Sequence, residues 1–228
     1  MQLKTKTCGD DSPKSQPVTL ESKTVRRRTF LQSGLFAAAA VVLRSSPIFD
    51  TWIEAARAAS IDLVHDTLNG LLAFVVPGPD LYSVGQGVST PQPGGVDADV
   101  NEVLIESLDF SAPYLPNFSA TVGAILNNLA QAVNPAAGGA FLSPFARLSF
   151  PEKVAVFQIM DGDASLSPLA GILLAAVAYL CYSEAGVFDR NTRSLTGQPV
   201  GWTISNYAGV ADGRDEFKGY FENRRGVD

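Results

Sequence analysis

The chain has 228 residues, of which 46% are hydrophobic and 18% charged, a composition typical of a globular protein. Nine of its 17 lysines and arginines, but only five of its 23 acidic residues, precede residue 59. Residues 59–228 therefore hold 8 basic and 18 acidic residues, a formal charge of −10. Because so acidic a body repels the phosphates of nucleic acids and of anionic lipids, nucleic-acid binding is excluded.

A basic motif followed by an apolar run marks the N-terminal region as an export signal. Arg27 and Arg28 are followed by Phe30 and Leu31, a pattern that resembles the consensus recognised by the twin-arginine translocase. The apolar residues 34–43 are too few to cross a bilayer as a helix, and their number fits the hydrophobic region of a signal peptide. We therefore expect a protein that folds in the cytoplasm and is exported to the periplasm, the cell envelope or the exterior.

A candidate cleavage site follows this apolar run. Residues 56–58 read Ala-Arg-Ala, the small-x-small pattern that signal peptidases cut, which places the cut after Ala58. The chain then divides into a twin-arginine signal segment, 1–58, which begins as a polar stretch predicted to be disordered, and one domain, 59–228. The alternative is that residues 49–59 form the first helix of the body and that nothing is cut.

The two cysteines, Cys8 and Cys181, are not expected to form a disulfide within the domain, because Cys8 lies in the signal segment. A domain without disulfides fits a protein that folds in the reducing cytoplasm before export. Cys181 lies in an apolar run, where burial raises the pKa of a thiol. We therefore expect it to be an inert core residue.

Apolar residues of the domain recur at helical spacing, and few stretches alternate with a period of two. Helix start signals bound several of these segments, most clearly the Ser149–Glu152 capping box. The predicted helices are 61–76, 100–108, 117–133, 149–160, 169–182 and 215–224. We therefore expect an all-α fold, a single compact helical domain. The segment 169–182 has no charged residue, which predicts a buried central helix.

Two loop-like stretches interrupt the predicted helices. The first, 76–95, is rich in glycine, serine and proline and is long enough to be functional or mobile. The second begins at residue 184, after the apolar helix, and is rich in glycine and in aromatic residues. We expect it to form a C-terminal loop region that closes with the last predicted helix.

Motifs for catalysis are weak. His65 could act as a base oriented by Asp62, but a half-exposed helix histidine beside an acidic neighbour is the simpler interpretation. Residues 161–165 match only the first half of a calcium loop and fit a helix–helix turn better. The carboxylates within 212–216 could bind a cation, but they also suit the start of a helix. No fingerprint for a nucleotide cofactor is present, so we expect no cofactor, no catalytic site and no metal site.

Four segments of the C-terminal third are distinctive. They are 179–186 (YLCYSEAG), 197–202 (GQPVGW), 206–213 (NYAGVADG) and 215–220 (DEFKGY). Together with the twin-arginine signal and the helical domain, they resemble the gluconate 2-dehydrogenase subunit 3 family. The resemblance implies a small, exported, non-catalytic subunit that binds the large subunit of a flavin-dependent oxidoreductase and carries it, already folded, through the translocase.

The aromatic residues of 184–221 are the expected contact surface for such a partner, because aromatic side chains supply large and rigid contact area. We expect Trp202, Tyr207, Phe217 and Tyr220 to bind it. The alternative is that these aromatics pack the region onto the helices. Two other functions stay open at this point: a stand-alone exported binding protein for an apolar small ligand, and an enzyme of unrecognised type that uses the histidine or the carboxylates described above.

Overall fold

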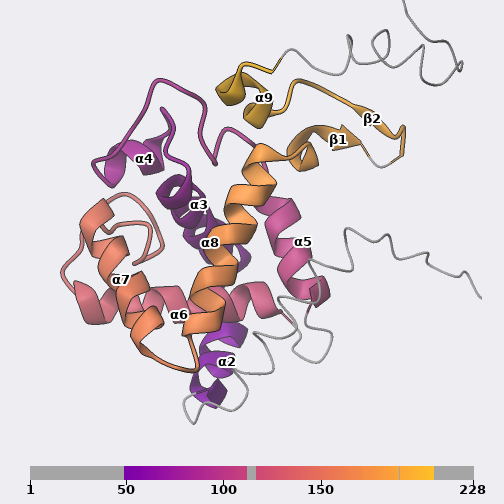
Figure 1. Cartoon of the computed structure of the whole chain (residues 1–228). Coiled ribbons are helices and arrows are strands. Elements are labelled where there is room, and N and C mark those ends of the chain that lie inside the picture. The colour runs from indigo at the N-terminus through magenta and orange to yellow at the C-terminus, as the bar shows by residue number, and fades with distance from the viewer. Residues whose placement is uncertain (1–48, 112–116, 190, 208–228) are drawn as a thin grey trace, which may run out of the picture.

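The computed structural model describes residues 49–111, 117–189 and 191–207, which form a mainly helical structure (Figure 1). The helices are α2 (Phe49–Ala58), α3 (Ile61–Val75), α4 (Leu81–Gly85), α5 (Asn101–Ser111), α6 (Phe118–Val133), α7 (Phe150–Gly162), α8 (Ser167–Tyr182) and α9 (Val200–Ser205). Between α8 and α9 lie a 3₁₀ turn, η1 (Ala185–Val187), and the paired strands β1 (Phe188–Asp189) and β2 (Ser194–Leu195). The helical class predicted from the sequence is therefore confirmed.

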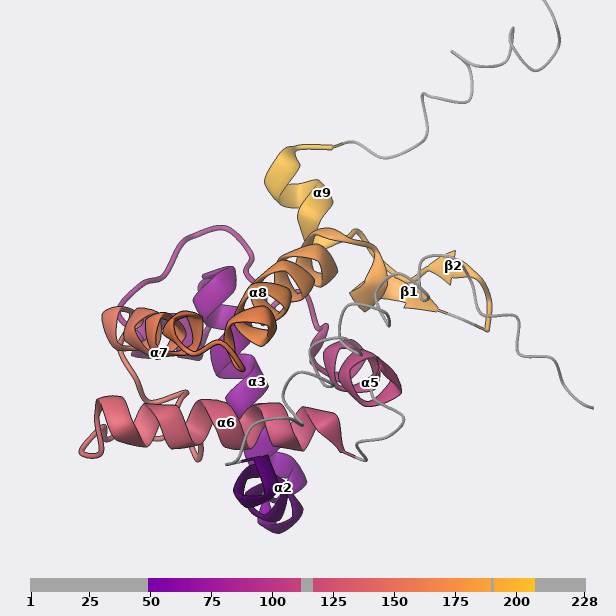
Figure 2. The same cartoon turned by 60° about the horizontal axis from the view of Figure 1, so that its bottom comes forward.

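Helices α3 and α6 form the centre of the fold. Their apolar side chains recur every three or four residues, and Leu68, Leu72 and Ile125 have no exposed surface. Figure 2 shows α2 on one side of α6 and the helices α5 and α7 on the other. The central position of α6 explains why all of its first nine residues are buried.

The start of α7 is held as the sequence predicts. The backbone amide and the hydroxyl of Ser149 both donate hydrogen bonds to Glu152 Oε2, at 2.8 and 2.7 Å. These bonds lower the pKa of the Glu152 carboxyl. The predicted helix at 100–108 is also present, as α5. Asp99, which precedes it, has φ of 51° and therefore lacks the extended backbone that a helix-capping residue adopts.

Helix α8 is not the fully buried central helix that its composition predicts. Leu169, Leu173 and Val177 are buried, whereas Tyr179 and Tyr182 are 49% and 50% exposed. In Figure 1 the helix lies across the front of the fold, so that one of its sides faces solvent. The prediction was wrong because alanine and glycine occupy much of the exposed side, and these small residues are compatible with either environment.

The loop predicted at 76–95 contains α4 and is packed onto the helices. Its two arms approach so closely that a Cβ atom on Gly78 would lie 2.6 Å from the backbone nitrogen of Gly94. The Asp80 carboxylate caps α4 by accepting hydrogen bonds from the backbone amides of Tyr82 and Ser83, both at 2.9 Å. The close contact between Gly78 and Gly94 gives both glycines a packing role.

The region predicted as a loop from residue 184 is partly ordered into η1, the β1–β2 hairpin and α9. The predicted helix 215–224 lies outside the described residues, as do Arg27, Arg28, Phe30 and Leu31 of the export motif. Within the part of the chain that the structure describes, no helix has the length and apolar character needed to cross a membrane.

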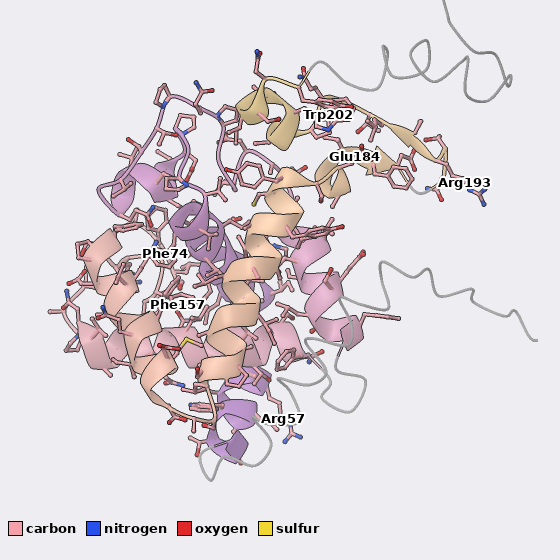
Figure 3. The ribbon with its side chains drawn as sticks, in the orientation of Figure 1. Arg57, Phe74, Phe157, Glu184, Arg193 and Trp202 are labelled. Carbon is pink, nitrogen blue, oxygen red and sulfur yellow. The ribbon has the colours of Figure 1, made fainter. Side chains whose placement is uncertain are left out.

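Helix α2 packs on the body although its sequence was assigned to the signal segment. Trp52 and Ala56 are each only 6% exposed and belong to the hydrophobic core, with α6 as the main contact. Arg57, between Ala56 and Ala58, is exposed (Figure 3). Cleavage after Ala58 stays a prediction, but it would remove a helix that fills part of the core. The packing therefore supports the alternative in which residues 49–59 begin the body.

We predict that Trp52→Ala lowers the free energy of unfolding by about 3 kcal/mol, because truncating a buried aromatic side chain costs roughly that much. Urea unfolding of the full chain, followed by circular dichroism, measures the change. Glu54→Ala, on the exposed side of the same helix, serves as the matched control and should change stability by less than about 0.5 kcal/mol. Equal stability of both variants would show that α2 contributes nothing to the folded body.

Candidate functional site

The strongest candidate for a functional surface lies at the C-terminal end of α8. We call it the hairpin–α9 surface and define it by Phe188, Leu195, Trp202 and Tyr207. Figures 1 and 2 both show the β1–β2 hairpin and α9 gathered at this end of the molecule. Phe188 and Leu195 are directly opposite each other in the antiparallel pair, and each is 36% exposed. Partners in such a pair lie on one face, which makes a small apolar patch.

Trp202 and Tyr207 form the second part of this surface. Their rings meet edge to face, with centroids 5.2 Å apart. Tyr207 is 46% exposed, and Trp202, which is labelled in Figure 3, is half-buried. The two aromatics thus pack on each other and also face solvent. The first feature fits packing within the chain, and the second fits a contact surface for a partner. Phe217 and Tyr220, the other predicted anchors, lie outside the described residues.

Two glycines fix the hairpin–α9 surface to the helices. A Cβ atom on Gly186 would lie 3.0 Å from Val100 Cγ1 and would overlap the carbonyl oxygen of Ala98. A Cβ atom on Gly201 would lie 2.7 Å from the Cα of Tyr182, at the end of α8. Because no side chain fits at either contact, the hairpin and α9 sit directly against backbone, and the surface has a defined place on the body.

The hypothesis of a catalytic His65 gains no support from its surroundings. The carboxylate that faces His65 Nε2 is Glu102 Oε1 of α5, at 3.4 Å, rather than the expected Asp62. Asn101 binds the backbone carbonyl of His65 at 3.0 Å, which ties α5 to α3. Within the described residues, no three or more histidine, cysteine, aspartate or glutamate side chains are grouped to hold a metal ion.

The turn between α7 and α8 matches the simpler interpretation of residues 161–165. Asp163 Oδ1 accepts hydrogen bonds from the backbone amide and the hydroxyl of Ser165, and Asp161 Oδ1 accepts one from Ser167. These are helix–helix turn contacts. Cys181 is also as expected, because burial raises the pKa of its thiol to about 12 and leaves almost no reactive thiolate at neutral pH.

A buried lysine is the most unusual group of the interior. Lys153 of α7 has no exposed surface, and its Nζ donates to the Gly70 carbonyl at 3.1 Å and to Gln86 Oε1 at 2.9 Å. The same amine lies 5.3 Å from the ring centroid of Phe145. Gln86 in turn donates to the Ala73 carbonyl at 2.8 Å. The cluster therefore joins α7, α3 and the segment that follows α4.

The environment of Lys153 favours the neutral amine. Burial lowers its pKa from 10.5 to about 7, and the negative charge of Asp80 opposes this shift only partly. Strongly shifted lysines occur at catalytic sites, but also in buried structural networks. The hydrogen bonds of Lys153 to Gly70 and Gln86 fit the second case, because they join α7 to α3 and to the segment after α4.

A second polar network lies beside the first. Asp66 accepts hydrogen bonds from the Tyr82 hydroxyl at 2.7 Å and from the Ser143 backbone amide at 2.6 Å. Burial, together with the bond to Asp66, raises the pKa of Tyr82 to about 12. The Ser143 hydroxyl donates to Asn127 Oδ1, and Asn127 Nδ2 donates to Thr67 Oγ1. This chain of bonds ties the loop before α7 to α3, α4 and α6.

Sequence reasoning missed both networks, although one signal was present. Lys153 stands in the apolar stripe of α7, in register with the buried Val156, Phe157 and Met160. A lysine at a core position of a helix has to find buried acceptors, so its spacing could have indicated an internal polar contact. Its partner Gln86 gave no such signal, because it lies in a segment without apolar periodicity.

A small cavity lies where α2, α3 and α6 meet. Its volume is about 110 Å³, and small side chains, among them Ala55, Gly123 and Ala124, line it. Thr67 and Asn127 add polar groups to the lining, but hydrogen bonds of the second network occupy both. Sites for small molecules usually measure about 300–1,000 Å³, so this space is too small for most metabolites.

Comparison with known proteins identifies no family for this chain. No protein-family model matches the sequence, and neither the curated proteins nor the solved structures yield a match.

We predict that the stability of the fold rises between pH 7 and 8.5 because of Lys153. Its pKa is about 7 in the folded state and 10.5 as the ordinary value, so the unfolded chain binds more protons in this interval and folding gains from each rise in pH. The gain should be about 1–2 kcal/mol in the free energy of unfolding. Urea unfolding at the two pH values measures it. Ionisation of the Cys181 thiol in the unfolded chain, whose ordinary pKa is 9.0, offsets the rise by only about a few tenths of a kcal/mol.

Lys153→Met keeps the length of the side chain and removes the titrating group. This variant should lose the rise between pH 7 and 8.5, whatever its stability at a single pH. Arg147→Met, which alters a partly exposed cation in the preceding loop, is the control and should keep the rise. The same slope in the Lys153→Met protein and in the unaltered chain would contradict the prediction.

Proposed function

We propose that this chain is an exported, non-catalytic accessory subunit that binds a flavin-dependent oxidoreductase and carries it through the twin-arginine translocase or stabilises it after export. The observation that carries the proposal is the hairpin–α9 surface. It displays exposed aromatic and aliphatic side chains on short elements that are fixed to the helices through Gly186 and Gly201. Such a surface suits contact with another protein, since interface cores are enriched in aromatic residues.

The position of this surface in the sequence adds to the proposal. The described part of the region that resembles gluconate 2-dehydrogenase subunit 3, residues 179–207, coincides with the end of α8, the hairpin and α9. Of the four residues that define the hairpin–α9 surface, Trp202 and Tyr207 stand in the segments quoted for the resemblance, whereas Phe188 and Leu195 lie between those segments. Gly186 and Gly201, which fix the surface to the helices, also stand in the quoted segments.

The rival function, a stand-alone binder of apolar ligands, has less support. It requires an apolar cavity, and a cavity that the described residues form between α2, α3 and α6 measures only about 110 Å³. An aromatic ring of six carbons already fills a space of about 150 Å³ in an engineered protein core. The accessory-subunit proposal needs no cavity, and for this reason we prefer it.

We predict that export depends on the arginine pair. The double variant Arg27→Lys, Arg28→Lys should stay in the cytoplasm, folded, because the translocase recognises the arginine pair and lysine lacks its planar guanidinium. Cell fractionation and immunoblotting measure the location, and protease resistance of the cytoplasmic pool reports folding. Lys4→Arg with Lys6→Arg, a change of the same type far from the motif, serves as the control. Normal secretion of the Arg27, Arg28 variant would refute the twin-arginine signal.

We also predict that Trp202 and Tyr207 anchor the partner. An aromatic anchor at the centre of an interface contributes about 2 kcal/mol or more, so Trp202→Ala should weaken the complex about thirtyfold. Because the two rings touch, their effects are coupled, and the double variant with Tyr207→Ala should lose less than the product of the two single losses.

The measurement is co-purification of the tagged chain from its native host, followed by titration of the captured flavoprotein. Leu142→Ala removes an apolar side chain that is 58% exposed on the loop before α7, and this control should bind normally. If the unaltered chain captures no flavoprotein, the proposed function fails. If all variants capture it equally, the partner is real and binds another surface.

A further inference from the structure

The exposed side of α8 is an apolar surface that no described residue covers. We call it the α8 stripe and define it by Gly171, Ala175, Tyr179 and Tyr182, which follow one another at helical spacing. The two tyrosines are half exposed, and a Cβ atom on Gly171 would meet nothing within 4 Å. Helix α8 has no charged residue. An uncharged, apolar helix side on the surface of an otherwise acidic domain is typical of a side that another segment or protein covers.

The chain beyond Tyr207 is long enough to reach this stripe, and α9, which precedes it, begins at the end of α8. Helix α9 contacts the end of α8, with Gly201 against the backbone of Tyr182. From Tyr182 back to Gly171 the stripe spans about 16 Å, at a helical rise of about 1.5 Å per residue. The sequence continues for residues 208–228, and seven extended residues alone can cover about 23 Å.

The sequence of 208–228 carries a matching pattern. Phe217, Tyr220 and Phe221 have the i, i+3, i+4 spacing of one helix face. Arg224 and Arg225 follow one turn later. At the far end of α8, the turn that starts the helix exposes two carboxylates, Asp161 and Asp163. An arrangement antiparallel to α8 would bring opposite charges together at that end.

We propose that residues 208–228 dock along the α8 stripe of their own chain, antiparallel to α8. The aromatic side chains of 217–221 lie over Ala175 and Tyr179, and the two arginines lie beside Asp161 and Asp163. The small residues of the stripe let the segment approach closely, while the tyrosines provide contact area. This inference is independent of the proposed function. It assigns Phe217 and Tyr220 to contacts within the chain, whereas the sequence analysis assigned them to a partner.

Disulfide trapping in the full chain tests the docking. The pair Ala175→Cys and Phe221→Cys is introduced together with Cys8→Ser, and Cys181 is kept because its buried thiol is unreactive. The control pair combines Phe221→Cys with Ala132→Cys, at an exposed alanine of α6. Docking raises the effective concentration of the two thiols, so the Ala175 pair should form its intramolecular disulfide at least about tenfold faster than the control pair.

Charge reversal tests the direction of docking. In the Ala175→Cys, Phe221→Cys chain, Arg224→Glu with Arg225→Glu should slow the disulfide about threefold at low salt, since exposed ion pairs contribute modestly. Equal rates for the Ala175 and Ala132 pairs overturn the proposal. Disulfide-linked dimers in place of the intramolecular bond also overturn it, because they show a second copy on the stripe. An unchanged rate after charge reversal overturns the antiparallel direction.

Discussion

The hydrogen bond between Lys153 Nζ and Gln86 Oε1 is the contact on which the arrangement of the chain depends. An amine in this position is costly to bury unless it finds acceptors, and Gln86 and Gly70 supply them. By binding Gln86, Lys153 holds the segment after α4 against α3 and α7. That segment continues to residues 94–98, whose backbone supports Cys181 and Gly186. The segment that Lys153 holds is thus continuous with the backbone against which Gly186 packs.

Helix α2 links the body to the predicted export signal. Trp52 and Ala56 fill a seam on α6, so α2 is part of the core rather than a spacer. A cut after Ala58 would expose that seam. A cavity of about 110 Å³ lies beneath α2 in this seam. The domain boundary drawn from the Ala-Arg-Ala pattern and the boundary drawn from packing therefore differ by one helix.

Sequence reasoning found most of the helices because their signals are local. The capping box at Ser149 and the apolar spacing of α3, α6 and α8 need no knowledge of the rest of the chain. The errors concern contacts between distant segments. Whether α2 is buried depends on α6, and the exposed side of α8 depends on which helices reach it. For the candidate site, the sequence identified Trp202 and Tyr207, and the structure places them in contact at the surface. Their binding role depends on a second protein, which no pattern in one chain can specify.

Some buried hydrogen bonds join residues far apart in the sequence, and this affects when the core can form during translation. Lys153 bonds a carbonyl 83 residues earlier, and the Ser143 amide bonds a carboxylate 77 residues earlier. A ribosome adds about 5–20 residues per second, so Gly70 emerges roughly 4–17 s before its partner exists. During most of that interval α3 is a nascent segment in which Asp66 lacks its hydrogen bond from the Ser143 amide. Closure of the core is therefore an event of late translation, and the N-terminal arginine pair is accessible to binding factors well before it.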